Sequence, residues 1–202
     1  MWRELPTETR EWAEEDWEGF FRNQDEQQFA EMQARPWEGS DEVGDDPAGS
    51  VAERAIMGLD EEEVLDPQRE YDEQLDEVLN RMPAWRAAAD FCDQTIEVLS
   101  PVLEGWRGGT TEFVAQTLVA ECYLVADYVL AGHELGYDEN TLCGNIALCV
   151  RSKRSLERCI RCLQELGGVR DERCRKLIVR ALVTGVFLDR RIAELRASVW
   201  WR

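Results

Sequence analysis

The stretch "CVRSKRSLERCIRC", residues 149 to 162, decides the fold because its apolar and basic residues separate at helical spacing. At 100° per residue, the apolar side chains in and around this stretch fall within about 100° of one another. They are Leu142, Ile146, Cys149, Leu156, Ile160 and Leu163. The pattern predicts a helix over residues 140–166 with one core face, and the glycine pair at 167–168 ends it.

Apolar residues on both sides of this segment recur at alternating spacings of three and four residues, which is typical of helices that share a core. The spacing predicts further helices over residues 84–106, 111–132 and 170–200. Because short turns join the four segments, we expect an all-α fold, an antiparallel up-down four-helix bundle. The helix at 111–132 is apolar nearly all round, so we expect it to be the most buried.

The N-terminal part of the chain differs from the rest in composition. Acidic and aromatic residues predominate there, and proline and glycine divide it into short segments. We expect an acidic, aromatic-containing helical extension over residues 1–82 and the bundle over residues 83–202. The extension should consist of a helix at 7–35, a loop at 35–50, a short helix at 50–58 and helical segments over 60–81.

Charge is distributed unevenly along the chain, whose net charge is −19. Residues 1–80 contain 26 acidic and 6 basic residues, a net charge of −20. Residues 137–202 contain 8 acidic and 14 basic residues, a net charge of +6. A uniformly acidic protein avoids nucleic acids and anionic membranes, but this asymmetry leaves the C-terminal third able to bind an anionic partner.

The cysteine content and the N-terminal residues bear on the compartment. The first residues, "MWRELPTETREW", have no apolar segment of the kind found in secretory signals. Glu121 and Asp127 interrupt the most apolar stretch, residues 113–132, so we expect no membrane span. Seven cysteines, an odd number, favour free thiols in a reducing environment. The expected localisation is the cytoplasm.

Four arginines lie opposite the core face of the helix at 140–166. They fall within about 80° of one another and span about 15 Å along the helix. We call them the basic stripe: Arg151, Arg154, Arg158 and Arg161. Guanidinium groups bind phosphates and carboxylates in bidentate fashion. Three interpretations remain open, namely a solvated face, a face neutralised by the folding back of the N-terminal acids, and a surface that binds RNA, DNA or an acidic protein.

Aromatic residues among the N-terminal acids indicate a second contact surface. A disordered acidic tail would contain few aromatic residues, so some surface should bury these rings. Docking on the chain's own bundle is one explanation, and insertion into a partner's groove is another. Mimicry of a nucleic acid is a third. The candidate partner-binding aromatics are Trp12, Trp17, Phe20 and Phe21.

Cysteine spacing raises the question of a metal. Cys159 and Cys162 lie one helical turn apart, and a zinc site would need two more ligands from Cys149, Cys174 or His133. Most of the cysteines occupy apolar positions, which favours core packing. The sequence contains no glycine-rich phosphate loop and no pair of histidines. We therefore expect no cofactor and no catalytic site.

Residues 84–200 resemble the four-helix-bundle family of rRNA intervening-sequence proteins, and within it the accessory variability determinant proteins of diversity-generating retroelements. The resemblance lies in "NTLCGNIALCVRSKRSLERCIRCLQELG", in the turn "GVRDERC" and in "LIVRALVTGVFLDRRIAELR". It implies a non-enzymatic, ring-like homo-oligomer that presents basic surface to a reverse transcriptase and its RNA. The contacts it implies are the basic stripe, with Arg175, Lys176 and Arg180 as neighbours.

The sequence therefore predicts a non-catalytic adaptor that binds a larger protein through the basic stripe and the acidic aromatic segment. The alternatives are a nucleic-acid-binding accessory factor of a reverse-transcriptase system, which would contact RNA or DNA through residues 149–180, and a cysteine-based metal-binding bundle. Assembly into a homo-oligomer is compatible with each of them.

Overall fold

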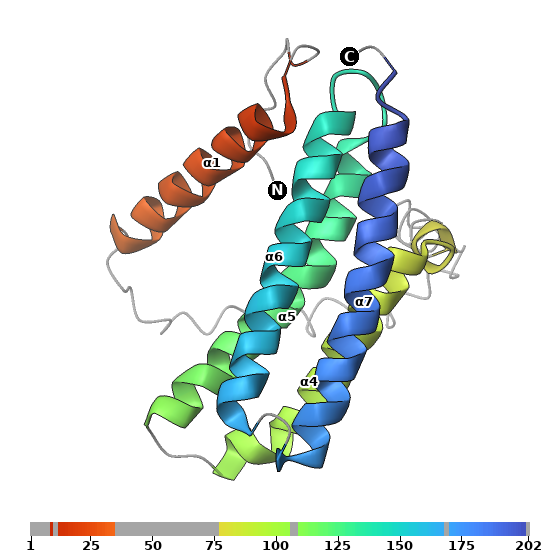
Figure 1. Ribbon diagram of the computed structural model, residues 1–202. Coiled ribbons are helices and arrows are strands. Elements are labelled where there is room, and N and C mark those ends of the chain that lie inside the picture. The colour runs from red at the N-terminus through yellow and green to blue at the C-terminus, as the bar shows by residue number, and fades with distance from the viewer. Residues whose placement is uncertain (1–8, 10–11, 35–76, 106–108, 168–169, 201–202) are drawn as a thin grey trace, which may run out of the picture.

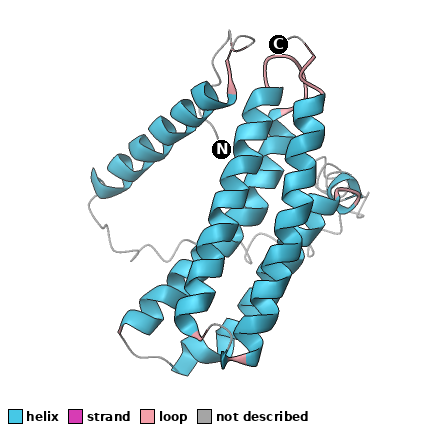
Figure 2. Cartoon of the chain, in the orientation of Figure 1, coloured by secondary structure: helices cyan, strands magenta, loops and turns pink. Residues whose placement is uncertain are grey.

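The computed structural model describes residue 9 and residues 12–34, 77–105, 109–167 and 170–200. All regular structure in these residues is helical, with no strand, which confirms the all-α fold class (Figure 1, Figure 2). The helices with complete bounds are α1 (Glu14–Ala34), α4 (Pro83–Gly105), α5 (Thr110–Leu135), α6 (Leu142–Leu166) and α7 (Glu172–Ala197).

The helix predicted over residues 7–35 begins later than its sequence pattern indicates, because residues 12 and 13 are not helical. Helix α1 has three acidic residues in its first turn, where negative charge stabilises the positive end of the helix dipole. Asp16 also accepts a hydrogen bond from the backbone N–H of Ala13, at 2.8 Å. The expected loop at 35–50 and the helical segments at 50–58 and 60–76 lie outside the described residues.

Four long helices enclose the main apolar interior. Helix α6 packs against α5 and α7, and α4 contacts both α5 and α7 (Figure 1). Each helix contributes one apolar stripe to this interior, as the spacing of three and four residues requires. The largest fully buried side chains among them include Phe91, Leu118, Val125, Leu163 and Leu188.

The connections between these helices depend on local backbone chemistry. Gly109 before α5 and Gly136 after it have φ angles of 118° and 114°, a region that residues with a Cβ rarely adopt. Helix α7 begins with Asp171, whose carboxylate accepts hydrogen bonds from the backbone N–H groups of Arg173 and Cys174. These bonds lower the pKa of Asp171. The turns are therefore fixed by a few residues.

Helix α6 is more deeply buried than α5, contrary to the sequence-based expectation. It contains 14 buried residues, whereas α5 contains seven. The reason is that α1 packs on α6 in addition to α5 and α7. Covering the outer side of α6 buries polar residues that would otherwise be exposed, among them Arg151.

Helix α5 is the one helix in the described ranges that is long and apolar enough, by length and composition, to cross a membrane. The core helix of a soluble protein passes the same test. Glu121, on α5, forms an ion pair with Arg158 of α6, with 2.7 Å between Oε1 and Nε. Burial raises the pKa of Asp127, the other acidic residue in its most apolar stretch.

Candidate binding surface

Helix α1 lies beside the upper half of α6 (Figure 1). Aromatic side chains make the contact between the two helices. Trp17 and Phe21 are fully buried, and they pack with Cys143, Ala147 and Leu148. Residues four apart share one face of a helix, which is why both rings reach α6. The two ring centroids are 5.5 Å apart. This pair anchors α1.

The other two candidate aromatics surround this anchor. Trp12 and Phe20 are half-buried and pack at its edge, with Tyr128 of α5. The centroid of Trp12 lies 5.3 Å from that of Trp17, with the rings nearly perpendicular. Edge-to-face pairs of this kind add to the free energy gained by burial alone. The structure therefore brings all four predicted aromatics into one cluster, on the chain's own helices.

Arg151 is the centre of the charged part of this contact. Its side chain is 9% exposed, and its Nε donates to Glu18 at 3.1 Å while its Nη2 donates to Asp25 at 2.7 Å. Its guanidinium carbon lies 5.6 Å from the centroid of Phe21 and 5.5 Å from that of Tyr128. Burial opposes the charge, but the hydrogen bond and the charge of Asp25, with Glu18, outweigh it and raise the pKa of Arg151. Two acids and two rings thus hold one cation.

Two further arginines hold α1 at more exposed positions. Arg154 donates from Nη1 to Glu18 at 2.9 Å, and its side chain is half exposed. Arg196, near the end of α7, makes a bidentate pair with Glu14, at 2.9 Å and 2.6 Å. The hydrogen bond to Glu14 raises the pKa of Arg196. Ion pairs at such exposure contribute little free energy each, so they orient α1 more than they anchor it.

The second half of the basic stripe forms no hydrogen bond or ion pair with the described residues of α1. Arg158 pairs with Glu121 of α5 and also donates to the hydroxyl of Ser155 at 3.2 Å. Arg161 is exposed and makes no ion pair with any described residue. The basic stripe is thus divided: its first two arginines bind α1, and Arg161 faces solvent.

The three basic residues expected to extend the stripe lie on α7 with other partners. Arg175 and Lys176 both pair with Glu172 of the same helix. Arg180 pairs with Asp90 of α4, at 3.0 Å. Their ion-pair partners are therefore separate from those of the basic stripe.

The cysteines lie mostly in the interior. All seven are free thiols, and only Cys162 is partly exposed. No group of three or more histidine, cysteine or acidic side chains able to hold a metal occurs among the described residues. Cys92 and Cys122 are neighbours, with 3.5 Å between the two Sγ atoms. Burial raises the pKa of Cys159 and of Cys162, which is unfavourable for thiolate chemistry.

The acidic partners of the stripe are not among the residues predicted individually from the sequence. Glu14, Glu18 and Asp25 are spaced by four and seven residues, so they share one face of α1 with the aromatic anchor close by. This spacing is a signal that could have identified them. Tyr128 had no such signal, because a tyrosine in an apolar helix is typical of any core.

The surface can therefore bind an acidic helix that carries aromatic anchors, and in this structure α1 is that helix. A cavity of about 330 Å³ remains between them, lined in part by Arg22, Val150 and Arg154. Comparison with protein-family models, with curated proteins and with solved structures finds no match to the chain.

Proposed function

We propose that the protein is a non-catalytic, cytoplasmic adaptor. In this proposal residues 83–202 form an up-down four-helix bundle and residues 1–82 an acidic extension. The basic stripe and its apolar surroundings on α6 recognise an acidic helix with aromatic anchors in a larger protein. Helix α1 occupies this surface until the partner replaces it, and its own aromatic face then becomes the second contact.

The observation that carries the proposal is the combination of contacts between α1 and α6. Two fully buried aromatic rings lie next to an arginine that donates hydrogen bonds to two carboxylates. Buried aromatics beside arginine are the usual energetic centre of a protein–protein interface. A surface of this composition fits an acidic helix better than it fits a solvent-facing role.

An acidic protein is favoured over a nucleic acid at this half of the stripe. Arg151 is 8% exposed and its guanidinium lies against the rings of Phe21 and Tyr128, where a phosphate backbone could not reach it without displacing α1. The groups that hold it, Glu18 and Asp25, are carboxylates on a helix. An acidic helix of a partner protein would present carboxylates to Arg151 in the same way.

A nucleic-acid accessory role is the second candidate, and Arg161 favours it. This arginine is exposed and makes no ion pair with a described residue, while Arg158 is also partly exposed beside it. Phosphate contacts through such residues would make binding strongly salt-dependent. RNA of a reverse-transcriptase system would be the ligand in that case.

A peptide of residues 12–34, labelled with a fluorophore, tests the proposed recognition. The recipient is the full chain carrying Trp17→Ala and Phe21→Ala, which weaken its own α1. We expect saturable binding of the peptide to this variant and about tenfold weaker binding to the unaltered chain. Arg151→Met in the recipient should abolish binding, whereas Arg190→Met, an exposed arginine on α7, should leave it unchanged.

The same recipient separates the two candidates when it is titrated with a short single-stranded RNA. Peptide binding without RNA binding supports the protein adaptor. RNA binding that weakens steeply with salt and is lost in Arg161→Glu, without peptide binding, would replace the adaptor by the nucleic-acid role. Binding of neither probe would contradict both.

A further inference from the structure

The outer face of α7 carries aliphatic side chains that no part of the interior uses. Val179, Leu182, Val183 and Val186 are 56%, 57%, 44% and 67% exposed. Their spacing of three, one and three residues places them on one face of the helix, opposite the buried Ala181 and Leu188. A contiguous exposed patch of large aliphatic residues is uncommon on a protein that works as a monomer. We call these four residues the α7 patch.

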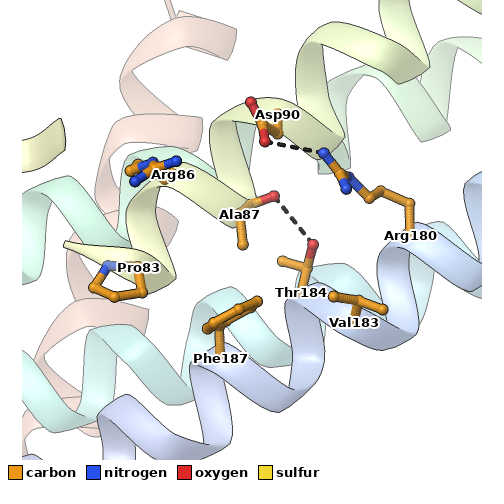
Figure 3. Close-up of a pocket in the computed structure, with 8 residues that line it drawn as sticks. All are labelled: Pro83, Arg86, Ala87, Asp90, Arg180, Val183, Thr184 and Phe187. Atoms are coloured by element: carbon orange, nitrogen blue, oxygen red, sulfur yellow. Dashed lines mark hydrogen bonds and ion pairs between the residues drawn. The ribbon is translucent and has the colours of Figure 1, made fainter. Parts of the chain in front are cut away.

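A recess lies beside the α7 patch, between α7 and the start of α4 (Figure 3). Its volume is about 280 Å³, and Val183 belongs to both the patch and the recess. Figure 3 shows Pro83 and Ala87 of α4 on one side and Phe187 and Val183 of α7 on the other. Arg86, Asp90, Arg180 and Thr184 line the rest of the recess, so its apolar residues extend the patch sideways beside a polar rim.

The α7 patch has charged residues at both ends, and the two ends differ in sign. On the face of α7 that carries the patch, the end before it has one acid and two bases, a net charge of +1: Glu172, Arg175 and Lys176. On the same face, the end after the patch carries two acids and one base, a net charge of −1: Asp189, Arg190 and Glu194. All six are exposed. A helix that packs along the patch therefore meets a net positive charge at one end and a net negative charge at the other.

We propose that the α7 patch binds a second copy of this chain, with the two α7 helices antiparallel about a two-fold axis beside Leu182 and Val183. This inference goes beyond the proposed function, since it concerns another face of the molecule. In the antiparallel arrangement the +1 end of each helix faces the −1 end of the other, for example Lys176 opposite Asp189. A uniformly acidic or uniformly basic partner would be repelled at one end, and a parallel copy at both.

The same six charges form their ion pairs within the chain when the patch is uncovered. Arg190 pairs with Glu194 at 2.9 Å, and Asp189 pairs with Lys153 of α6. Because these pairs are exposed, exchanging them for pairs across an interface costs little. An apolar centre with a polar rim of this kind is the usual anatomy of a homodimer interface. A two-fold axis makes one patch complementary to itself.

Sedimentation equilibrium of the full chain tests the proposal directly. We expect a reversible dimer at micromolar concentration, and Val186→Glu should raise its dissociation constant about tenfold or more by burying an unpaired carboxylate. Phe113→Glu is the matched control, since Phe113 is 69% exposed on α5 and its replacement should leave the dimer intact. Circular dichroism checks that both variants keep their helix content.

The orientation is tested by disulfide trapping with oxidised glutathione. Val183→Cys, beside the proposed axis, should form a disulfide-linked dimer, whereas Arg190→Cys should not, because antiparallel packing places the two residues 190 about 22 Å apart. A monomer at all concentrations, a dimer unaffected by Val186→Glu, or trapping of Arg190→Cys without Val183→Cys would each overturn the proposal.

Discussion

Gly144 of α6 lies directly beneath the indole ring of Trp17, so close that a Cβ at this position would be 2.8 Å from Cδ2 of the ring. The same Cβ would lie 2.6 Å from a terminal methyl group of Leu135. A leucine methyl can rotate away, but a fully buried indole ring has little room to move. Gly144 therefore sets how closely α1 approaches α6.

Gly144→Ala should loosen α1 and leave the rest of the protein folded. The added methyl group forces Trp17 outward, and fully seated aromatic anchors of this size contribute about 3–5 kcal/mol. We expect faster hydrogen exchange in residues 12–34 by mass spectrometry, with α4 to α7 unchanged. Gly185→Ala is the control, because its Cβ would meet only Leu156, at 3.6 Å. Unaltered exchange in Gly144→Ala would contradict this account of the contact.

Arg151 should contribute more to the attachment of α1 than Arg154 does, although both bind Glu18. A hydrogen bond to a charged group contributes about 1.5–3 kcal/mol to the free energy of unfolding. An exposed ion pair contributes only about 0–1 kcal/mol. We expect Arg151→Ala to raise hydrogen exchange in α1 strongly and Arg154→Ala to raise it slightly. Equal effects of the two substitutions would show that burial does not determine their contributions.

His133 should titrate below the ordinary value for histidine. Burial lowers its pKa from 6.5, and the charge of Arg191 lowers it further. Its Nδ1 lies 2.5 Å from the hydroxyl of Tyr137, which accepts from Arg191 at 2.7 Å, so Tyr137 donates its proton to a neutral imidazole. The stability that His133 contributes is present above pH 6.5 and is lost as the pH falls through its folded-state pKa.

Proton NMR measures this directly, since the chain contains a single histidine. The midpoint of its ring resonances should lie below 6.5, and Arg191→Gln should move it upward by removing the nearby positive charge. A midpoint above 6.5 in the unaltered protein would mean that the imidazolium form is stabilised here instead.

The thiols should differ in reactivity according to exposure. Cys162 is partly exposed, whereas the remaining six are buried. Burial raises the pKa of Cys149 to about 11, so it has almost no thiolate at neutral pH. With an aromatic disulfide reagent we expect one thiol to react before unfolding and the rest only in denaturant. Cys162→Ser should abolish the early reaction and Cys174→Ser should not, and several early-reacting thiols would contradict the buried positions.

Sequence periodicity was sufficient to predict which residues form the core face of α6. Leu142, Ile146, Leu156 and Leu163 are all buried, as predicted from their positions on one side of α6. Each of these placements depends only on the 3.6-residue repeat, a local property of the chain. For the same reason the α7 patch was not identified, because periodicity shows which residues share a face but not whether another element covers it.

The division within the basic stripe could not be predicted in the same way. Arg151 and Arg161 lie on the same side of the helix, about 80° apart, yet Arg151 is 8% exposed and Arg161 is open to solvent. The difference arises from α1, whose acids lie more than a hundred residues earlier in the chain. Charge composition indicated that the acids could fold back, and only the tertiary structure shows which arginine they reach.

The distance along the chain between α1 and its binding surface has a consequence for protein synthesis. Asp25 precedes Arg151 by 126 residues. At translation rates of 5–20 residues per second, α1 leaves the ribosome about 6 to 25 seconds before its site on α6 has been made. During that interval Trp17 and Phe21 have no place to pack, and the surrounding carboxylates keep the nascent segment soluble. We therefore expect the acidity of α1 to limit aggregation of the growing chain before α1 binds α6.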